Sequence, residues 1–563
     1  MVTRFDVGAF WPHPPAHVLG ALLVVALTFF VTYLRTRREY QKWVQNANGR
    51  PVPPPRLPYT IPWLGSALSM LSRIPGQFWD HLAAHHANKA GAITVLLGGE
   101  RMHVLFSPVA LQALFKARHV TRHVQTVKAL VSGFGMEQAE CERYFDVEGK
   151  GTEEKGGKRI DRMAQQEHIM VNYLFKHEAA CGLTMDFERL LVDELKEYSS
   201  QLPSDGTEVN LCDWIKTMMG RASTKAFMGT EIFEAYPSML EDFLEFDDII
   251  MTLFFDIPRF MAPGPYRIRE KLLQGLQDWH NHIDVHTTDI LPPDSPQRWD
   301  LKLGARCLRA RHIMYKEVHL NPRSKAAQDL GFFFALSSNS IPTAAYMLMH
   351  ILDPNADPWL LRRVQTELNS SWQPDKTALD IEKLSSQPLL QSIFYEVLRL
   401  YMDFMITRHC DEDTVLPTTD TSAQNPLLFP KGTTILSPTW LAHHSPTYHS
   451  APSTFDPERY LLPSPSNSNE PMFSLANTGG KLHPFGGGKT ICPGRTFAKQ
   501  EVFCLLAWVF REFEVESKEF VDGEGEARKE FPVLAKQLTG TGILGLEGDL
   551  RVRVRVKGGE GRG

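Results

Sequence analysis

Cysteine is scarce in this sequence, and its few residues follow no metal-binding pattern. The 563 residues include seven cysteines, and no two of them form a C-x-x-C pair. A disulfide-dense secreted scaffold needs many more cysteines, and a zinc cluster needs them at short spacings. Both classes are therefore excluded, and we expect a reducing compartment.

An excess of charge of either sign is also missing. The 60 Lys and Arg residues nearly balance the 65 Asp and Glu residues, so the net charge is −5. A nucleic-acid-binding domain needs a clear basic excess, so we expect no nucleic-acid partner. Apolar residues make up 43% and charged residues 22% of the chain, which is ordinary for a folded protein and excludes wholesale disorder.

Nucleotide-binding fingerprints are absent as well. Gly488-Lys489-Thr490 resembles the end of a phosphate loop, but that motif needs a glycine five residues before Gly488, where the sequence has His483. No Rossmann or flavin module and no fixed-period repeat is evident. The length permits either several domains or one large domain.

The segment His17–Leu34 contains no Lys, Arg, Asp or Glu. As a helix it spans about 27 Å, close to the thickness of a bilayer core. The positive charge follows this run, which disfavours a cleaved signal peptide and places the C-terminal side in the cytosol. We therefore expect a lumenal N-terminus (1–16), a transmembrane anchor (17–34), a basic and proline-rich hinge (35–66) and a cytosolic catalytic domain (67–563).

The body is predicted to be mainly α-helical with small β-sheets. Ala92–Gly98 and Arg101–Ser107 are β-rich runs around a turn at Gly99-Glu100, which indicates a hairpin. Arg551–Val556 alternates strictly and predicts a strand.

The run Gly331–Leu352 is apolar on every side, so it is either a buried helix or a second membrane span. Four consecutive polar residues, 337–340, and then Pro342 interrupt it. Such an interruption suits a lipid-facing span poorly. We therefore expect a buried helix with a kink beside a polar cluster.

A glycine-rich loop with one cysteine lies near the C-terminus. His483–Ala498 reads HPFGGGKTICPGRTFA, and its glycines allow a flat ligand to approach the backbone. Pro493 suits the first position of a helix, whose dipole and amides favour a thiolate at Cys492. The alternatives are a soft metal ligand and an inert buried cysteine.

Phe485-x-x-Gly488-x-x-x-Cys492-x-Gly494 resembles the haem-binding signature of cytochromes P450. Glu396-x-x-Arg399 resembles that family's E-x-x-R motif, and Phe455–Arg459 resembles its aromatic-x-x-P-x-R segment. The anchor and hinge resemble the microsomal class, so the resemblance covers essentially the whole chain. It implies the haem-thiolate fold of that family, mainly α with small sheets, plus one transmembrane helix.

The resemblance also implies residue roles. Cys492 is implied to be the thiolate ligand of the iron of haem b. Glu396, Arg399 and Arg459 are implied to form a buried charged cluster that braces the loop. The remaining implied haem contacts are Phe485, Gly486 and, at a propionate, Arg408. Lys489, Arg495 and Lys499 suggest a basic surface for an acidic electron donor, and Met239–Phe260 suggests a lid or an ordinary core face.

The sequence departs from the family pattern in places that bear on activity. Thr490 stands where many relatives have Arg or His, and no W-x-x-x-R signature is visible around Glu167–His177. The usual acid–threonine pair is replaced by a segment in which Asn339 and Ser340 are the candidate catalytic residues. This substitution resembles the branch of sterol 7α-hydroxylases and prostacyclin synthase. Which of the two residues faces the iron stays open.

Three functions remain. The first is a monooxygenase at the endoplasmic reticulum membrane that uses O₂, and NADPH through a separate cytochrome P450 reductase, on a small apolar substrate such as a sterol, terpenoid, fatty-acid-like molecule or other secondary metabolite. The second is a peroxide or endoperoxide isomerase that needs no reductase. The third is a non-catalytic haem-binding membrane protein.

Overall fold

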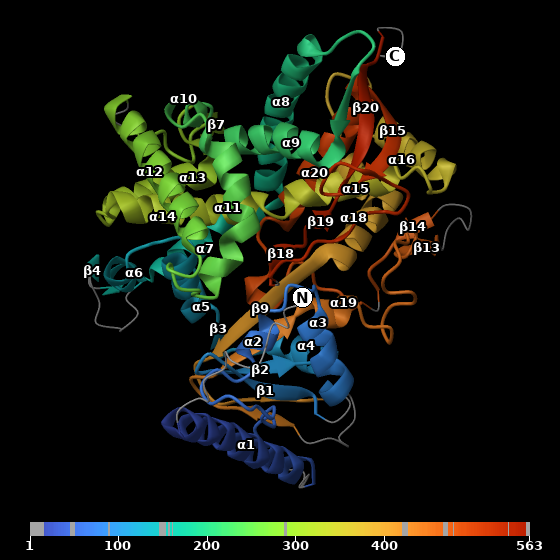
Figure 1. The fold of residues 1–563 in the computed structure, drawn as a ribbon. Coiled ribbons are helices and arrows are strands. Elements are labelled where there is room, and N and C mark those ends of the chain that lie inside the picture. The colour runs from blue at the N-terminus through green and yellow to red at the C-terminus, as the bar shows by residue number, and fades with distance from the viewer. Residues whose placement is uncertain are drawn as a thin grey trace, which may run out of the picture.

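The computed structural model describes residues 16–45, 51–87, 90–145, 154–155, 158–159, 161–286, 290–418, 426–464, 471–476, 478–538 and 540–558. Helices dominate this part of the chain, and the sheets are small. Figure 1 shows a large helical region beside a smaller region built around strands β1, β2 and β9. The predicted lumenal segment before residue 16 lies outside the described residues, as does most of the polar insertion Ser464–Asn469.

The first helix, α1 (Ala16–Gln45), contains the predicted apolar run and continues past it through the basic residues. Within its section His17–Trp43, an 18-residue window has a mean hydropathy of 2.2 and is not buried, and α1 is the one helix in the described part of the chain that is long and apolar enough to cross a membrane. The C-terminal end of α1 contacts the body. Tyr40 shares a hydrogen bond of 2.7 Å with His86, and the Trp43 indole donates to the carbonyl of Pro53 at 2.8 Å.

The predicted hairpin is confirmed as β1 (Ala92–Leu97) and β2 (Glu100–Leu105). Its turn is Gly98-Gly99, one residue earlier than expected, because both turn positions have positive φ values that favour glycine. The sheet continues in the order β1-β2-β12-β9-β18, with β12 parallel to β2 and the other pairs antiparallel. The added strands are β9 (Met402–Cys410), β12 (Thr434–Pro438) and β18 (Thr541–Ile543), and β3 (Val120–Thr121) also pairs with β9.

The main core lies between long helices that carry apolar residues on their inner faces. The helices at its centre are α8 (His177–Gln201), α9 (Leu211–Met228), α15 (Ser340–Ile351), α18 (Pro388–Tyr401) and α20 (Arg495–Glu512). Around them lie α7 (Arg162–Met170), α11 (Met239–Phe254), α12 (Pro263–His286), α13 (Arg306–Glu317), α14 (Pro322–Ser337), α16 (Pro358–Ser370) and α17 (Ile381–Ser386).

A second sheet stands at the C-terminal end, in the order β16-β15-β20-β6. The predicted strand at 551–556 is confirmed within β20 (Asp549–Val556), which pairs with β15 (Phe513–Val521) and with β6 (Thr207–Asn210). Short elements connect these parts: α2 (Ala67–Met70), α3 (Gln77–Leu82), α4 (Pro108–Lys116), α5 (His123–Lys128), α6 (Gln138–Phe145), α10 (Ile232–Ala235), α19 (Thr439–His443) and β16 (Ala527–Arg528).

The apolar run 331–352 is buried, as predicted, but it forms two helices instead of one kinked helix. Helix α14 ends at Ser337 and α15 begins at Ser340. Pro342 has no N–H to donate to the carbonyl four residues earlier, and its ring crowds that carbonyl. The chain therefore opens one turn before the proline, at Ser338 and Asn339.

The core around β1 and β2 gives a direct test of packing. Trp79 is 0% exposed within this cluster, whereas Trp359 on α16 is 62% exposed. Trp79→Ala should lower the free energy of unfolding by about 3–5 kcal/mol because it empties a packed site. Trp359→Ala should cost about 1 kcal/mol or less. Denaturant unfolding of the two variants checks this, and equal losses would contradict the assigned core.

Candidate haem-thiolate site

Cys492 lies between a short 3₁₀ turn, Gly488–Thr490, and the start of α20. Its backbone N–H donates to the carbonyl of Phe485 at 2.9 Å and closes the loop on itself. The helix begins at Arg495 with Gly494 as its cap, so the expectation of Pro493 as the first helical residue is wrong. Gly494 has φ −85° and ψ 0°, which is not helical, and the backbone N–H groups of Gly494 and Arg495 are hydrogen-bonded to the cysteine sulfur.

Two opposing effects set the protonation of this thiol. Burial raises the pKa of Cys492, because a thiolate loses hydration inside the protein. The amides of Gly494 and Arg495 and the guanidinium groups of Arg495 and Arg122 act in the opposite direction. The site therefore holds a thiol with preformed donors for the charged form, which is what a thiolate ligand to a metal needs.

The glycines of the loop pack tightly on one side. A methyl group on Gly487 would lie 2.4 Å from the ring of Phe115, and one on Gly488, with φ at +68°, would lie 2.3 Å from the carbonyl oxygen of Phe115. A methyl group on Gly486 would meet nothing within 4 Å. The loop thus presses against α4 at one face and leaves space beside Gly486, where a flat ligand could approach the backbone.

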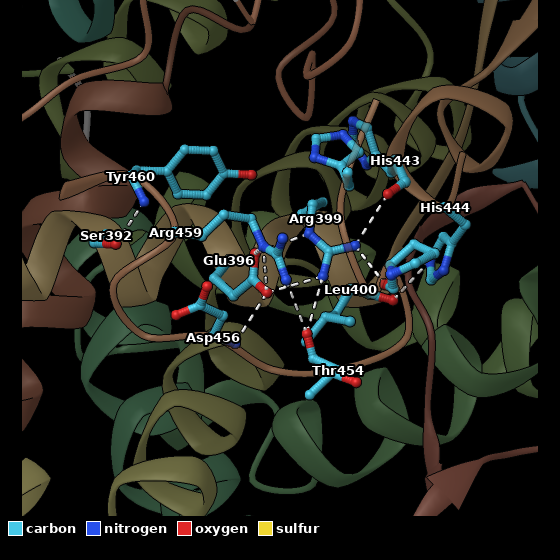
Figure 2. A network of polar contacts seen from close by, with 12 residues as sticks. Ser392, Glu396, Arg399, Leu400, His443, His444, Thr454, Asp456, Arg459 and Tyr460 are labelled. Carbon is cyan, nitrogen blue, oxygen red and sulfur yellow. Dashed lines mark hydrogen bonds and ion pairs between the residues drawn. The ribbon is translucent and has the colours of Figure 1, made fainter. Parts of the chain in front are cut away.

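Glu396, on α18, is a fully buried carboxylate that two guanidinium groups hold (Figure 2). Arg399 donates to both carboxylate oxygens at 2.8 Å. The Nε atom of Arg459 lies 3.0 and 2.9 Å from the same two oxygens. The backbone N–H of Asp456 adds a third partner at 3.1 Å, so the buried charge is fully compensated.

The same arginines tie α18 to the chain that leads to the cysteine loop. Arg399 also donates to the carbonyls of His443 at 3.0 Å and Pro452 at 2.6 Å. Arg459 donates to the carbonyls of Ser450 and Thr454. Figure 2 shows the bonds to the carbonyls of His443, at the end of α19, and of Thr454. The cluster therefore fixes the path of the backbone before it reaches Cys492.

Phe485 and Arg408 lie against the loop from different elements. The ring of Phe485 stacks on Phe394 of α18, with centroids 6.3 Å apart and an angle of 23°. Arg408, on β9, is buried and donates to the carbonyl of Gly487 at 3.1 Å. Both residues therefore adjoin the loop that carries Cys492.

A second cation lies close to Arg408, at a position that sequence reasoning missed. Burial lowers the pKa of Arg408 to about 10, and the nearby charge of Arg122 adds to this effect. Arg122 contacts Glu167 at 3.4 Å, but its Nε atom is buried without a partner. Two neighbouring guanidinium groups with one weakly held carboxylate suit an added anionic group. No local motif marks Arg122.

Asn339 and Ser340 point to different neighbours at the break between α14 and α15. The Asn339 side-chain oxygen accepts the backbone N–H of Ile543, on β18, at 2.9 Å. The Ser340 hydroxyl donates to the carbonyl of Leu336 at 3.2 Å and is also hydrogen-bonded to Glu501 of α20. Ser340 is thus directed at α20, whereas the amide nitrogen of Asn339 remains a donor.

The comparisons with known proteins agree with this arrangement. The sequence profile described as "Cytochrome P450" matches residues 158–539, which is more than half of the chain.

The chain belongs to the cytochrome P450 family.

Several P450 relatives are enzymes of known or named reaction type. Cytochrome P450 monooxygenase calL of Penicillium decumbens is 28% identical over 476 residues, covering 82% of this chain and 85% of that protein. Cholesterol 7-alpha-monooxygenase of Cricetulus griseus is 26% identical over 332 residues, covering 56% and 59%. The 7-alpha-hydroxycholest-4-en-3-one 12-alpha-hydroxylase of Oryctolagus cuniculus is 25% identical over 563 residues, covering 96% and 98%. This P450 is thus an oxidoreductase of the monooxygenase type, related at low identity to the sterol 7α-hydroxylase branch.

P450 enzymes carry haem, and the described residues fit that group. The Cys492 sulfur has two amide donors, the backbone at Gly486 borders open space, and Arg122 keeps an unpartnered buried nitrogen beside Arg408. The Cys492 sulfur could bind the iron, the space beside Gly486 could hold the flat ring, and Arg122 with Arg408 could hold its anionic substituents. The roles of these residues toward haem remain predictions.

Glu501 is a second residue that sequence reasoning missed. It is 0% exposed on α20, and one oxygen accepts the hydroxyl of Ser223 at 3.2 Å. Burial raises its pKa to about 8. A signal was present: Glu501 is four residues after Phe497 and four before Leu505, so helical spacing puts it on the buried face.

The basic surface expected near the loop is smaller than predicted. Lys489 is exposed, but Arg495 donates to the carbonyl of Cys492, and its guanidinium lies over the ring of Phe175. Lys499 is half-buried and donates to the carbonyl of Ser385. Long cationic side chains pack their stems along apolar neighbours, which explains the loss of two of the three charges from the surface.

The charged cluster predicts a large difference between two arginines. Arg399→Ala removes two bonds to a buried carboxylate and should cost about 3–5 kcal/mol in the free energy of unfolding. Arg363→Ala breaks an exposed pair with Glu458 and should cost less than about 1 kcal/mol. Chemical denaturation of both variants measures this, and a small loss for Arg399→Ala would show that Glu396 is not held as a buried charge.

Glu501 predicts a pH dependence of stability. Its folded pKa is raised above the usual value, so the unfolded chain releases this proton first as pH rises. The wild-type protein should therefore lose stability between about pH 5 and pH 8 relative to Glu501→Gln, with equal stability below that window. Unfolding curves of the two proteins at several pH values check this. Parallel pH profiles would contradict it.

Proposed function

We propose that this P450 is a membrane-anchored haem-thiolate monooxygenase that hydroxylates or oxidises an apolar substrate with O₂. Cys492 is the proposed ligand to the iron of haem b. The observation that carries the proposal is the buried Cys492 sulfur with two backbone donors, in a loop braced through Glu396, Arg399 and Arg459. Haem bound by a thiolate supplies the O–O bond cleavage that such oxidations need.

Residues of this chain have distinct proposed tasks around that group. Arg408 and Arg122 would hold the anionic substituents of haem, and Phe485 and Gly486 would border it from the cysteine loop. Asn339, anchored to Ile543 through its oxygen, would present its amide nitrogen as a hydrogen-bond donor, whereas Ser340 would position the helix break through Glu501. The relatives' names support hydroxylation, and two of them name sterol substrates. A sterol, terpenoid, fatty-acid-like molecule or other secondary metabolite is the proposed substrate class.

The proposed location is the endoplasmic reticulum membrane, with the catalytic domain in the cytosol. The apolar section of α1 and the arginines that follow it support a single-pass anchor. Electrons are proposed to come from NADPH through a separate cytochrome P450 reductase, because the sequence carries no nucleotide-binding fingerprint of its own.

The experiment uses two cysteine variants. Cys492→Ala should abolish the red-shifted Soret band of the reduced, carbon-monoxide-bound protein, because that band requires a thiolate ligand. Cys181→Ala, which removes a half-buried thiol on α8, should keep it. A wild-type protein without the band, or a Cys492→Ala variant with it, would overturn the haem-thiolate assignment.

Turnover then separates the reaction types. Candidate lipids are incubated with reductase and NADPH, or with the corresponding lipid hydroperoxide alone, and products are identified by mass spectrometry. A product that contains one oxygen from O₂ and depends on NADPH supports the monooxygenase. Turnover of the hydroperoxide alone would support the isomerase instead.

A further inference from the structure

A cavity of about 230 Å³ lies beside the break between α14 and α15. One wall is α11, and another is the segment around residues 536–545, which includes β18. Its lining mixes polar and charged side chains with apolar ones, which include Phe243, Leu244, Ile341 and Leu538. The cavity therefore offers an apolar body of ligand a place to pack.

Polar groups gather where this cavity meets the helix break. Ser337 is 0% exposed to solvent, and its hydroxyl oxygen has no hydrogen-bond partner. Ser338, the next residue, is hydrogen-bonded to the carboxyl group of Asp247 on α11. A buried hydroxyl without a partner costs free energy, so a native structure that keeps one needs an explanation.

The charged groups around the cavity limit which chemical groups a ligand can place there. Burial and the neighbouring Asp248 raise the pKa of Asp247 well above its usual value, and Lys216 on α9 opposes this. The carboxyl group of Asp247 lines the cavity together with Ser337, so it offers an oxygen acceptor close to the hydroxyl that lacks a partner. The other charged lining residues, Arg73 and Lys536, are exposed to solvent.

We propose that this cavity binds the substrate through a hydroxyl group on an apolar skeleton, with Ser337 and Asp247 as its hydrogen-bond partners. This inference rests on the proposed function and names the substrate class as an apolar alcohol. Lys216 and Asp248 place charges of both signs on the lining, so a charged ligand group of either sign would meet a like charge there as well as an opposite one. A neutral hydroxyl matches the available donors and acceptors without adding a charge.

The test measures binding to the haem-loaded, full-length protein by equilibrium dialysis, without NADPH or reductase. The probes share one rigid skeleton: adamantan-1-ol, 1-chloroadamantane, adamantane-1-carboxylate and 1-adamantylamine. Adamantan-1-ol should bind about tenfold more tightly than 1-chloroadamantane, the gain expected from hydrogen bonds to groups that otherwise lack a partner. The carboxylate and the amine should bind more weakly than the alcohol.

Two variants assign the effect to the cavity. Ser337→Ala and Asp247→Leu should each reduce the alcohol's advantage over the chloride severalfold and leave binding of the chloride unchanged. Glu245→Leu, an exposed position on the same helix that does not line the cavity, is the matched control and should change neither value. Far-UV circular dichroism of each variant confirms an intact fold.

Equal binding of alcohol and chloride to the wild-type protein would overturn the inference. Tighter binding of the carboxylate or the amine would do so as well, as would variants that keep the full preference. Failure of the proposed function is seen separately. It shows as a missing thiolate-type spectrum or missing NADPH-dependent product, whereas the binding preference is measured without either.

Discussion

The site depends on one buried carboxylate held by two guanidinium groups. Glu396 is fully buried, so an ionised side chain there is stable only with complete hydrogen bonding. Arg399 supplies two bonds from the same helix, and Arg459 supplies two from a distant segment. The pairing therefore joins two parts of the chain that could not bury these charges separately. Because the spare nitrogens of the arginines bind backbone carbonyls, the same interaction also shapes the chain before the cysteine loop.

That constraint matters because the environment of the cysteine is a balance of opposing effects. Burial disfavours the thiolate, and the amides of Gly494 and Arg495 favour it. Amide donors act over short distances and need a fixed backbone. The bond from the Cys492 N–H to Phe485, the close contact of Gly487 with Phe115 and the stacking of Phe485 on α18 supply that rigidity. The balance between thiol and thiolate at Cys492 thus depends on packing and ion pairing in other parts of the chain, including α4 and α18.

Patterns among neighbouring residues predicted much of the fold, but contacts between residues that are distant in the sequence could not be predicted. The hairpin, strand β20 and the buried run 331–352 follow from periodicity and turn residues, which act between near neighbours. The helix start was predicted at Pro493 and found at Arg495, because Gly494 takes a non-helical conformation that propensity at Pro493 does not report. Arg122 carries no local signal, since only the folded chain brings it near Arg408. Glu501 was detectable in principle, as a charge on an otherwise apolar helical face.

The break between α14 and α15 shows why four adjacent polar residues need not form one site. Successive residues of a helix point about 100° apart, and a break widens the range of directions further. Ser337 and Ser338 line the cavity, the latter bonded to Asp247; Asn339 binds β18; Ser340 binds Glu501 of α20. Each hydroxyl or amide therefore connects the same break to a different neighbour.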